Sequence, residues 1–518
     1  MTLQPHNLTS GATSQPHNLT FLTTSQAEQP HNLTTSKPSL NVPNFKGLIK
    51  DTAIYGVSSI VGRFLNYLLT PLWTYYMPKA GGDYGVLTNM YAWTALLLVI
   101  LTFGMETTLF RFANQQDQKP DTVFATAFAW VGILSAVFVG GVMLFLTPIS
   151  EALHYADHPE YVWIMAGVTL LDVLQALPFC YLRFQHRAIK FVSLKMLVIL
   201  INVVCNLVFF TLLHKTDVVY VFAINLACSA ATTFFFIPDF FHLKWHFDGA
   251  LLRRMLSYSW PILVLGIAGI LNQTADKIFF PLVCSAEDAK AQLAEYGACI
   301  KVAMIMALIT QTFRYGYEPI VFAKNGSSDN ASDKLVYYAE AMKWFIIFTL
   351  AAFLAVVAFM DWLQILIGAE YRKGLFVVPI VMAAEIMMGI YFNLSFWYKL
   401  IDKTIWGMWF SAAGCIVMTA GNLLFIPEYG YVACAWSGFA GYAVCMLTSY
   451  IVGQRLNPIP YDLKTIGGYT LLAGAMFAGM ELVPWTGIVG ILVKATLLCI
   501  YLIPVLLTLR RFLVKKVK

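Results

Sequence analysis

Fourteen apolar stretches of membrane-spanning length follow one another between residues 52 and 508, with short polar connections between them. A bilayer core about 30 Å thick needs about 20 apolar helical residues for each crossing. The chain is 59% hydrophobic and only 12% charged, and a soluble protein has no use for so many long apolar segments. The sequence therefore predicts an all-α polytopic membrane protein that acts in or across the bilayer.

Both chain termini are predicted to be cytoplasmic. An even number of crossings places them on one side, and Lys and Arg collect on the cytoplasmic side of membrane proteins. With the termini inside, 22 Lys and Arg lie near the inner ends of the spans and only five near the outer ends. A missed span would invert every later loop, so this bias also supports the spans themselves. They are placed at 52–77, 84–106, 122–146, 161–182, 191–213, 218–238, 258–282, 294–320, 336–360, 375–398, 404–426, 430–452, 465–483 and 488–508.

The first 45 residues differ from the rest. The hexapeptide Gln-Pro-His-Asn-Leu-Thr occurs three times, at 4–9, 15–20 and 29–34. Such a polar, proline-bearing repeat cannot bury enough apolar surface to fold. It also lacks the basic segment followed by an apolar segment that marks a signal peptide. We interpret 1–45 as a disordered tail, with a repeated ligand for a partner as the alternative.

An acidic-Tyr-Gly triplet recurs at the predicted starts of three spans, at 83–85, 295–297 and 428–430. We expect the acidic residue to cap the helix and the glycine to permit a tight entry. The first two triplets open the second and eighth spans, which indicates two related halves of six spans, as in transporters whose lobes rock about a central site. The alternative explanation is that the three triplets reflect a residue preference common to helix N-termini and not an internal repeat.

The predicted organisation has five parts. Between the lobes, the basic and apolar residues of 240–257 indicate an interfacial amphipathic helix. The parts are a tail (1–45), an N-lobe (46–239), the linker helix (240–257), a C-lobe (258–454) and the last two spans with a basic C-terminal segment (455–518).

Three motifs resemble a known family: Ile-Tyr-Gly-Val-Ser-Ser-Ile-Val-Gly-Arg-Phe-Leu-Asn at 54–66, Gly-Asp-Tyr-Gly-Val at 82–86 and Phe-Gly-Met-Glu-Thr-Thr-Leu-Phe-Arg-Phe at 103–112. Together they resemble the polysaccharide transporter family, the oligosaccharide flippases typified by O-antigen flippases. That family belongs to the multidrug/oligosaccharidyl-lipid/polysaccharide (MOP) superfamily, with the lipid II flippases and the MATE drug exporters. Beyond these motifs the resemblance lies mainly in the arrangement of six, six and two spans.

The resemblance implies a bacterial inner-membrane protein that works for surface polysaccharide or lipopolysaccharide biosynthesis. It implies translocation of undecaprenyl-pyrophosphate-linked oligosaccharide from the cytoplasmic to the outer leaflet by alternating access. It also implies a cavity lined by spans 1, 2, 7 and 8. A MATE-like cation-coupled multidrug exporter and a lipid II flippase are the alternatives.

Charges within the spans are the candidate site residues, since a charge costs about 2.5–3.5 kcal/mol at the centre of a spanning helix and so usually serves a function. Cations suit a pyrophosphate because they form charge-assisted bonds to it. We therefore expect the cargo to meet Arg63, Lys277, Lys301 and Arg314. Arg63 could instead pair with Asp172, Asp276 with Lys277, and Arg314 with Glu318 as structural pairs.

Other polar residues within the spans are assigned to gating, coupling or sugar contact. Glu106 with Arg314, or Arg111 with Glu318, could close an inner gate when the lobes tilt. Buried carboxylates could carry a coupling proton or sodium ion, and buried amides could contact sugars or join helices. The gate and coupling candidates are Glu106, Arg111, Asp172, Asp276, Glu318 and Glu385, and the amides are Asn66 and Asn272.

Several other functions are disfavoured. The chain shows no nucleotide-binding loop, no GxSxG or HExxH motif and no large outer loop for a catalytic domain, so we expect a transporter and not an enzyme. We expect no cofactor and no metal site, since the pair His154 and His158 lacks a third ligand. The basic residues sit at span ends, which argues against nucleic acid as a partner. Lipid-linked oligosaccharide and membrane lipids are the expected partners of a monomer.

Overall fold

The computed structural model describes Leu65 and residues 67–115, 118–242, 245–284, 288–325, 331–401, 403–485 and 487–517. The predicted tail, Arg63, Asn66 and most of the first span lie outside the described residues. So does the side chain of Glu318, although its backbone is part of a helix.

The described part of the chain is all-helical, as predicted, with no strand. The first half contains α2 (Leu69–Tyr76), η1 (Lys79–Gly81), α3 (Asp83–Thr102), α4 (Met105–Ala113), α5 (Pro120–Leu144), α6 (Leu146–Ala152), α7 (Pro159–Phe184), α8 (Ala188–Leu207), the π-helical segment η2 (Val208–Leu212) and α9 (Val218–His242). The second half begins with α10 (Gly249–Val283), α11 (Ala289–Asn325), α12 (Ala331–Ala358), α13 (Met360–Leu363), η3 (Gln364–Leu366) and η4 (Ala369–Val377). It ends with α14 (Val378–Leu394), α15 (Phe396–Leu400), α16 (Ile405–Tyr429), α17 (Tyr431–Leu456), α18 (Leu463–Glu481) and α19 (Gly487–Val517).

Among the described residues, twelve helices are long and apolar enough to cross a membrane. They correspond to the second to twelfth predicted spans and to the fourteenth. The thirteenth predicted span is α18, a 19-residue helix that packs with α19. The confirmed architecture is therefore an all-α polytopic membrane protein, and its interior is filled by apolar side chains of the kind that the hydropathy pattern selects.

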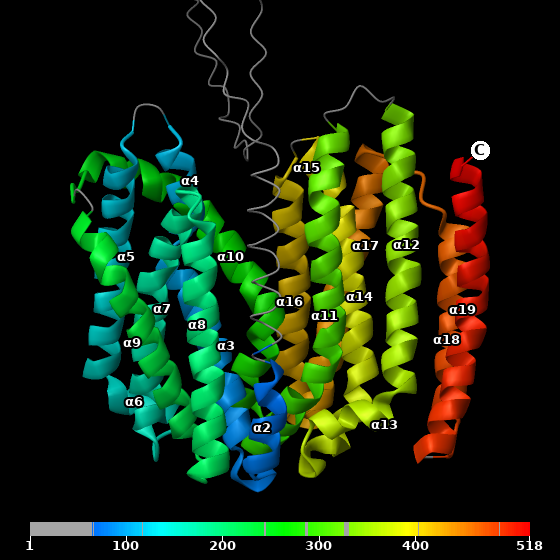
Figure 1. Ribbon diagram of the computed structural model, residues 1–518, viewed down its shortest axis with the longest axis horizontal. Helices are drawn as coiled ribbons and strands as arrows, with labels where there is room; N and C mark the ends of the chain where they lie inside the picture. Colours follow the sequence, from blue (N-terminus) through cyan, green and yellow to red (C-terminus); the bar gives the residue numbers. More distant parts are fainter. Residues whose placement is uncertain are drawn as a thin grey trace, which may run out of the picture.

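The helices form two bundles with a pair of helices at one edge (Figure 1). One bundle holds α3 to α9, the other holds α11 to α17, and α10 runs obliquely between them. The outer pair, α18 and α19, packs against α12, where the Tyr501 hydroxyl donates to the Ile347 carbonyl oxygen at 3.1 Å. The two lobes and the peripheral pair thus appear in space in the order that they take along the chain.

The linker differs from the sequence-based expectation. Residues 249–257 are not a separate interfacial helix but the first turns of the 35-residue helix α10. The Asp248 carboxylate caps that helix by accepting from the Ala250 and Leu251 amides at 2.9 and 3.0 Å. Satisfied N-terminal amides allow the helix to begin at Gly249. This first part of α10 packs on the N-lobe, where the Ser259 and Thr108 hydroxyls lie 2.5 Å apart.

The acidic-Tyr-Gly triplets do not act as helix caps in the structure. No side chain caps α3, and Glu295 lies one and a half turns inside α11. The glycines act instead as points of close approach between the two lobes. A Cβ atom on Gly85 of α3 would lie 2.1 Å from the Lys290 carbonyl oxygen, and one on Gly297 of α11 would lie 2.5 Å from the Thr88 hydroxyl. The capping interpretation was wrong, while the repeat itself marks matching contacts on the two related helices.

Candidate functional site

The two lobes meet at the ends where α2 stops and where α3 and α11 begin, which we call the closed end. It is the lower end in Figure 1, and the Lys and Arg bias predicts that it is the outer side of the membrane. The Lys79 ammonium pairs with the Glu295 carboxylate of α11 across the interface. Glu295 also accepts from the Tyr431 hydroxyl at 3.4 Å, and its side chain is almost fully buried. Such a pair holds the lobes together only while both charges are present, because removing one of them leaves the other buried without a partner of opposite charge.

A second set of closed-end contacts joins α2 to the segment that connects α12 with α14. Tyr75 donates to the Ile365 carbonyl oxygen at 2.8 Å, and Tyr371 donates to the Met77 carbonyl oxygen at 2.8 Å. The Gly368 amide donates to the Thr74 hydroxyl at 3.1 Å. A Cβ atom on Gly368 would lie only 2.0 Å from the Thr74 carbonyl oxygen, so the approach requires glycine.

The next layer inward holds the predicted pair Asp276 and Lys277 of α10. The Lys277 ammonium lies 2.8 and 2.9 Å from the two Asp276 carboxylate oxygens and 3.0 Å from the Gln273 carbonyl oxygen. The buried Tyr296 hydroxyl donates to Asp276 at 2.7 Å. The pair thus links α10 to α11 through three side chains.

The N-lobe reaches the same layer through Asn89 of α3. Its amide donates to the Lys277 carbonyl oxygen at 2.7 Å, and its side-chain oxygen accepts from the Tyr155 hydroxyl at 3.0 Å. Burial raises the pKa of Tyr155 well above its usual value, so the hydroxyl stays protonated and can donate. Lys277 therefore lies where the two lobes touch.

Lys301 and Glu385 lie close to this pair. The Lys301 ammonium is 5.6 Å from the Tyr67 ring centroid, and the Tyr67 hydroxyl donates to the Met304 sulfur at 3.1 Å. Lys301 and Glu385 are each near enough to Lys277 for their charges to interact. In the described part of the chain this cluster carries two cations, Lys277 and Lys301, and two carboxylates, Asp276 and Glu385. It is the candidate functional site, and we call it the interlobe charge cluster.

Asn272 lies one turn from the cluster and joins helices. Its side-chain NH2 group donates to the Ser411 carbonyl oxygen of α16 at 3.1 Å, and its backbone carbonyl oxygen accepts from the Tyr442 hydroxyl at 2.9 Å. The side-chain oxygen is buried without a hydrogen-bond partner among the described residues. The amide group therefore serves packing, while contact of its oxygen with a sugar hydroxyl stays a prediction.

The opposite end of the bundle holds the predicted gate residues. None of the contacts described here joins one predicted gate residue to another. Glu106 lies 3.3 Å from Arg183, within the N-lobe. The Arg111 guanidinium stacks 4.0 Å above the Tyr258 ring, and that of Arg314 lies 4.9 Å from the Phe392 ring centroid. The pair of Glu106 with Arg314 is not formed in this state, and the pair of Arg111 with Glu318 involves a side chain outside the described ones.

Asp172 faces the interior of the N-lobe and not the charge cluster. Its carboxylate accepts from the Ser229 hydroxyl of α9 at 2.6 Å, and the charge of Lys195 of α8 acts on it. The alternative pair with Arg63 lies outside the described residues. The two histidines of the loop before α7 also have separate partners, since His154 contacts the Pro281 carbonyl oxygen at 3.0 Å and His158 contacts Glu160 at 2.8 Å.

The residues that hold the closed end together were not among the site residues predicted from the sequence. Lys79 is a loop residue, Glu295 was assigned to a helix cap, and Tyr75 and Tyr371 are two of many aromatic residues. A signal was nevertheless present in the matched Gly85 and Gly297, because a glycine within a helix usually marks a close approach.

A sequence profile described as "Polysaccharide biosynthesis protein" matches residues 48–313, just over half of the chain. The chain belongs to the polysaccharide biosynthesis protein family. This membership agrees with the resemblance drawn from residues 54–66, 82–86 and 103–112. Comparison with curated proteins yields no match.

Two solved structures show the fold that this polysaccharide biosynthesis protein shares. One is the lipid II flippase MurJ in an inward closed conformation, with TM-score 0.69, 13% identity and coverage of 87% of this chain and 98% of that chain. The other is a MATE family multidrug resistance transporter of the MOP superfamily in an inward-facing conformation, with TM-score 0.62, 13% identity and coverage of 76% and 93%. Both of these solved proteins move their substrates across a membrane, one as a flippase and the other as a transporter. The chain therefore shares its fold with a lipid II flippase and with a MATE family transporter of the MOP superfamily.

Proposed function

We propose that this protein translocates undecaprenyl-pyrophosphate-linked oligosaccharide from the cytoplasmic to the outer leaflet of the bacterial inner membrane, for surface polysaccharide or lipopolysaccharide biosynthesis. The observation that carries the proposal is the interlobe charge cluster, which places Lys277 and Lys301 between the lobes of a polysaccharide biosynthesis family member.

The chemistry of the cargo fits two lysines at this depth. A pyrophosphate loses its hydration when it enters the bilayer, and an ammonium group offsets part of that cost through charge-assisted hydrogen bonds. In this structure the Lys277 ammonium is paired with the Asp276 carboxylate, and the Tyr296 hydroxyl donates a hydrogen bond to the same carboxylate. An arriving pyrophosphate competes with Asp276 for the same ammonium, and Lys301 supplies a second cation close to it.

Alternating access supplies the movement. The contacts of the closed end block the predicted outer side in this state. Outward opening breaks the pair of Lys79 with Glu295 and separates Gly85 from Lys290. At the other end we propose that Glu106 pairs with Arg314, or Arg111 with Glu318, when that end closes; for Glu106 this requires exchange of its present partner Arg183.

Coupling to an ion gradient is assigned to the buried carboxylates. Glu385 forms no hydrogen bond within the described chain and lies near Lys277, so a proton or sodium ion on it changes the field at the cargo site. Asp172 is the second candidate, inside the N-lobe. We propose that the protein acts as a monomer, with both termini cytoplasmic and without a cofactor.

The test uses cells in which the gene is deleted. We expect lipid-linked oligosaccharide to accumulate with its glycan inaccessible to a periplasmic glycan-modifying enzyme, and the wild-type gene to restore access. Accumulation of lipid II instead supports the lipid II flippase alternative. Unchanged glycan access together with sensitivity to cationic drugs supports the MATE-like exporter.

A further inference from the structure

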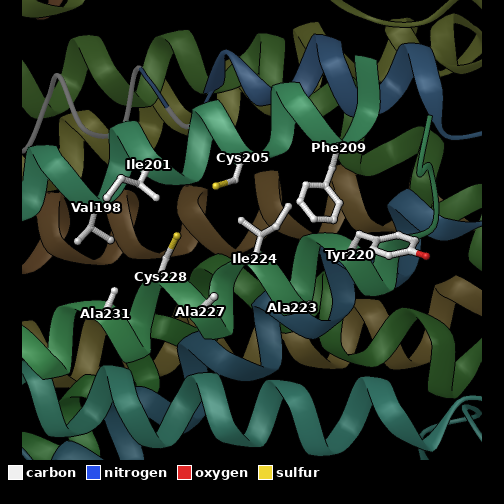
Figure 2. Close-up of a pocket in the computed structure, with 10 residues that line it drawn as sticks. All are labelled: Val198, Ile201, Cys205, Phe209, Tyr220, Ala223, Ile224, Ala227, Cys228 and Ala231. Atoms are coloured by element: carbon white, nitrogen blue, oxygen red, sulfur yellow. The ribbon is translucent and has the colours of Figure 1, made fainter. Parts of the chain in front are cut away.

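An apolar groove runs between α8 and α9 on the N-lobe, away from the interlobe charge cluster (Figure 2). It encloses about 270 Å³. Its walls are almost wholly apolar, and the lining residues include Val198, Ile201, Cys205, Phe209, Ile224 and Cys228. Figure 2 shows these side chains converging from the two helices, with Tyr220 at the end near Phe209. Nothing in the proposed transport cycle uses this groove.

The groove has the depth of one membrane leaflet. Val198 and Phe209 mark its two ends on α8 and η2, and eleven helical steps correspond to about 16 Å. Half of a hydrocarbon core is about 15 Å. Phe209 lies just beyond the end of α8, at the start of η2, and Tyr220 lies near the start of α9, so this end of the groove lies toward the membrane surface. Val198 is ten residues inside α8, so the other end lies near the bilayer midplane.

The surface end of the groove carries a cation and a free hydroxyl. The Lys215 ammonium lies 6.0 Å from the Tyr220 ring centroid. The Tyr220 hydroxyl has no hydrogen-bond partner within the described chain, and it points away from the apolar wall in Figure 2. The same connection holds His214 and Asp217, and Asp217 acts on Asp83 and Tyr161 of neighbouring helices. An ammonium and a phenol at a membrane surface suit a phosphate group.

The midplane end offers no comparable head-group site. Lys195 lies one turn beyond Val198 on α8, but its ammonium turns back toward the start of the helix. It lies 4.6 Å from the Phe179 ring centroid and 5.8 Å from that of Phe191. A lysine that turns toward the nearer membrane surface is snorkelling. The groove is thus polar only at the end beside Lys215.

The groove is built into the lobe and opens away from its interior. Behind it, the side chains of Asn202 and Asn225 join α8 to α9 with a hydrogen bond of 2.7 Å, and Asn225 also bonds the Tyr91 hydroxyl of α3. On the other side Ala223 and Ala227 of α9 are exposed.

The equivalent helices of the C-lobe, α16 and α17, approach each other closely. A Cβ atom on Gly414 of α16 would lie 2.2 Å from the Cys445 sulfur of α17, so these two helices pack in close contact. At this contact α16 and α17 leave no room for an acyl chain between them.

We propose that this groove is a specific phospholipid site, with one acyl chain between α8 and α9 and the lipid phosphate at Lys215 and the Tyr220 hydroxyl. The leaflet-length apolar wall recognises the chain, and the positive surface end recognises the phosphate. The bound lipid fills the space between two helices that the protein itself leaves unfilled. It also fixes the position of α8 beside α2, where Tyr76 and Phe210 meet edge to face at 6.3 Å.

The test uses the full-length protein in nanodiscs that contain phosphatidylglycerol with a photoreactive diazirine in the middle of one acyl chain. We expect adducts to concentrate on the groove residues of α8 and α9. Ala227→Phe fills the groove and is expected to lower these adducts at least fivefold, and Lys215→Ala is expected to lower them several-fold. Ala230→Phe is the matched control, because Ala230 is equally exposed on α9 but does not line the groove, and it is expected to leave the adducts unchanged.

Three results overturn the proposal. Adducts spread evenly over the lipid-facing helices indicate annular lipid only. Adducts that survive both Ala227→Phe and a second filling variant, Ala223→Phe, in folded protein place the chain elsewhere. Loss of the adducts on adding an equal amount of polyprenyl phosphate assigns the groove to an isoprenoid tail instead of a phospholipid. Thermal unfolding and size-exclusion profiles establish that each variant is folded.

Discussion

Lys277 makes the contacts that give the interlobe charge cluster its shape. It bonds the Asp276 carboxylate through its ammonium and Asn89 through its carbonyl oxygen, and it acts on Glu385 and Lys301. The sequence could show that charges occur within spans 7, 8 and 10, because each lies in an apolar run. It could not show which of them meet, because the crossing of α10 with α3 and α11 depends on glycines and packing far from the charges.

A double substitution separates a structural role of Lys277 from a role in cargo binding. Lys277→Gln leaves Asp276 buried beside Tyr296 without its cation, which is strongly destabilising. The double variant Asp276→Asn with Lys277→Gln removes both charges and is expected to restore expression. Glycan access in cells is expected to stay at least tenfold low, since a charge-assisted hydrogen bond contributes about 1.5–3 kcal/mol and about 1.4 kcal/mol is a tenfold effect. Recovery of transport in the double variant would assign the pair to structure alone.

The buried pair at the closed end offers a second test at this scale. Lys79→Glu places two carboxylates together at the interface of α11 and is expected to favour outward opening. Adding Glu295→Lys restores an opposite pair and is expected to recover most of the lost activity. Accessibility of the closed end to a membrane-impermeant thiol reagent, at a cysteine introduced for Thr88, reports the opening. Equal labelling of the single and double variants would contradict a gating role.

At the scale of elements, the helix positions followed the hydropathy pattern more closely than the helix ends did. The start of α11 lies five residues before the predicted one and that of α10 nine residues before, because polar residues at a membrane surface can extend a helix without changing the apolar run. For the same reason, residues 249–257 of the predicted linker helix are part of α10 and not a separate helix. The close approach of α3 to α11 had a sequence signal in Gly85 and Gly297, but its partner atoms are visible only in three dimensions.

Gly85→Ala tests whether α3 and α11 must touch for the closed end to form. The added Cβ atom would lie 2.1 Å from the Lys290 carbonyl oxygen, and overpacking of this kind typically costs about 1–3 kcal/mol. Because the cost falls on the closed state alone, the variant is expected to populate the open state more and to transport less. Gly81→Ala, which has open space around its Cβ position, is the control. Double electron–electron resonance between labels on α3 and α11 measures the populations, and an unchanged distance distribution would rule out this contact as part of the gate.

At the scale of the whole molecule, the all-helical membrane fold could be derived from the sequence because hydropathy alone determines which segments cross a bilayer. The family could be recognised from motifs around spans 1 and 2. The conformational state of the molecule could not be derived, since the closed end is held by pairs such as Lys79 with Glu295 that are far apart in sequence.

The predicted orientation of the protein in the membrane rests on the Lys and Arg bias. Fusions of a reporter after Gln364 are expected to be active only when the reporter requires the periplasm, and the opposite result would invert the transport direction.

The most direct measurement of the account is transport by purified protein in proteoliposomes that contain undecaprenyl-pyrophosphate-linked oligosaccharide with a fluorescent glycan. Quenching by an impermeant reagent counts the glycans that cross. We predict that the wild-type protein and Lys373→Ala, a cation outside the interlobe charge cluster, transport at similar rates, and that Lys301→Ala is at least tenfold slower although it folds normally. Equal rates for Lys301→Ala and wild type would contradict a cationic pyrophosphate path between the lobes.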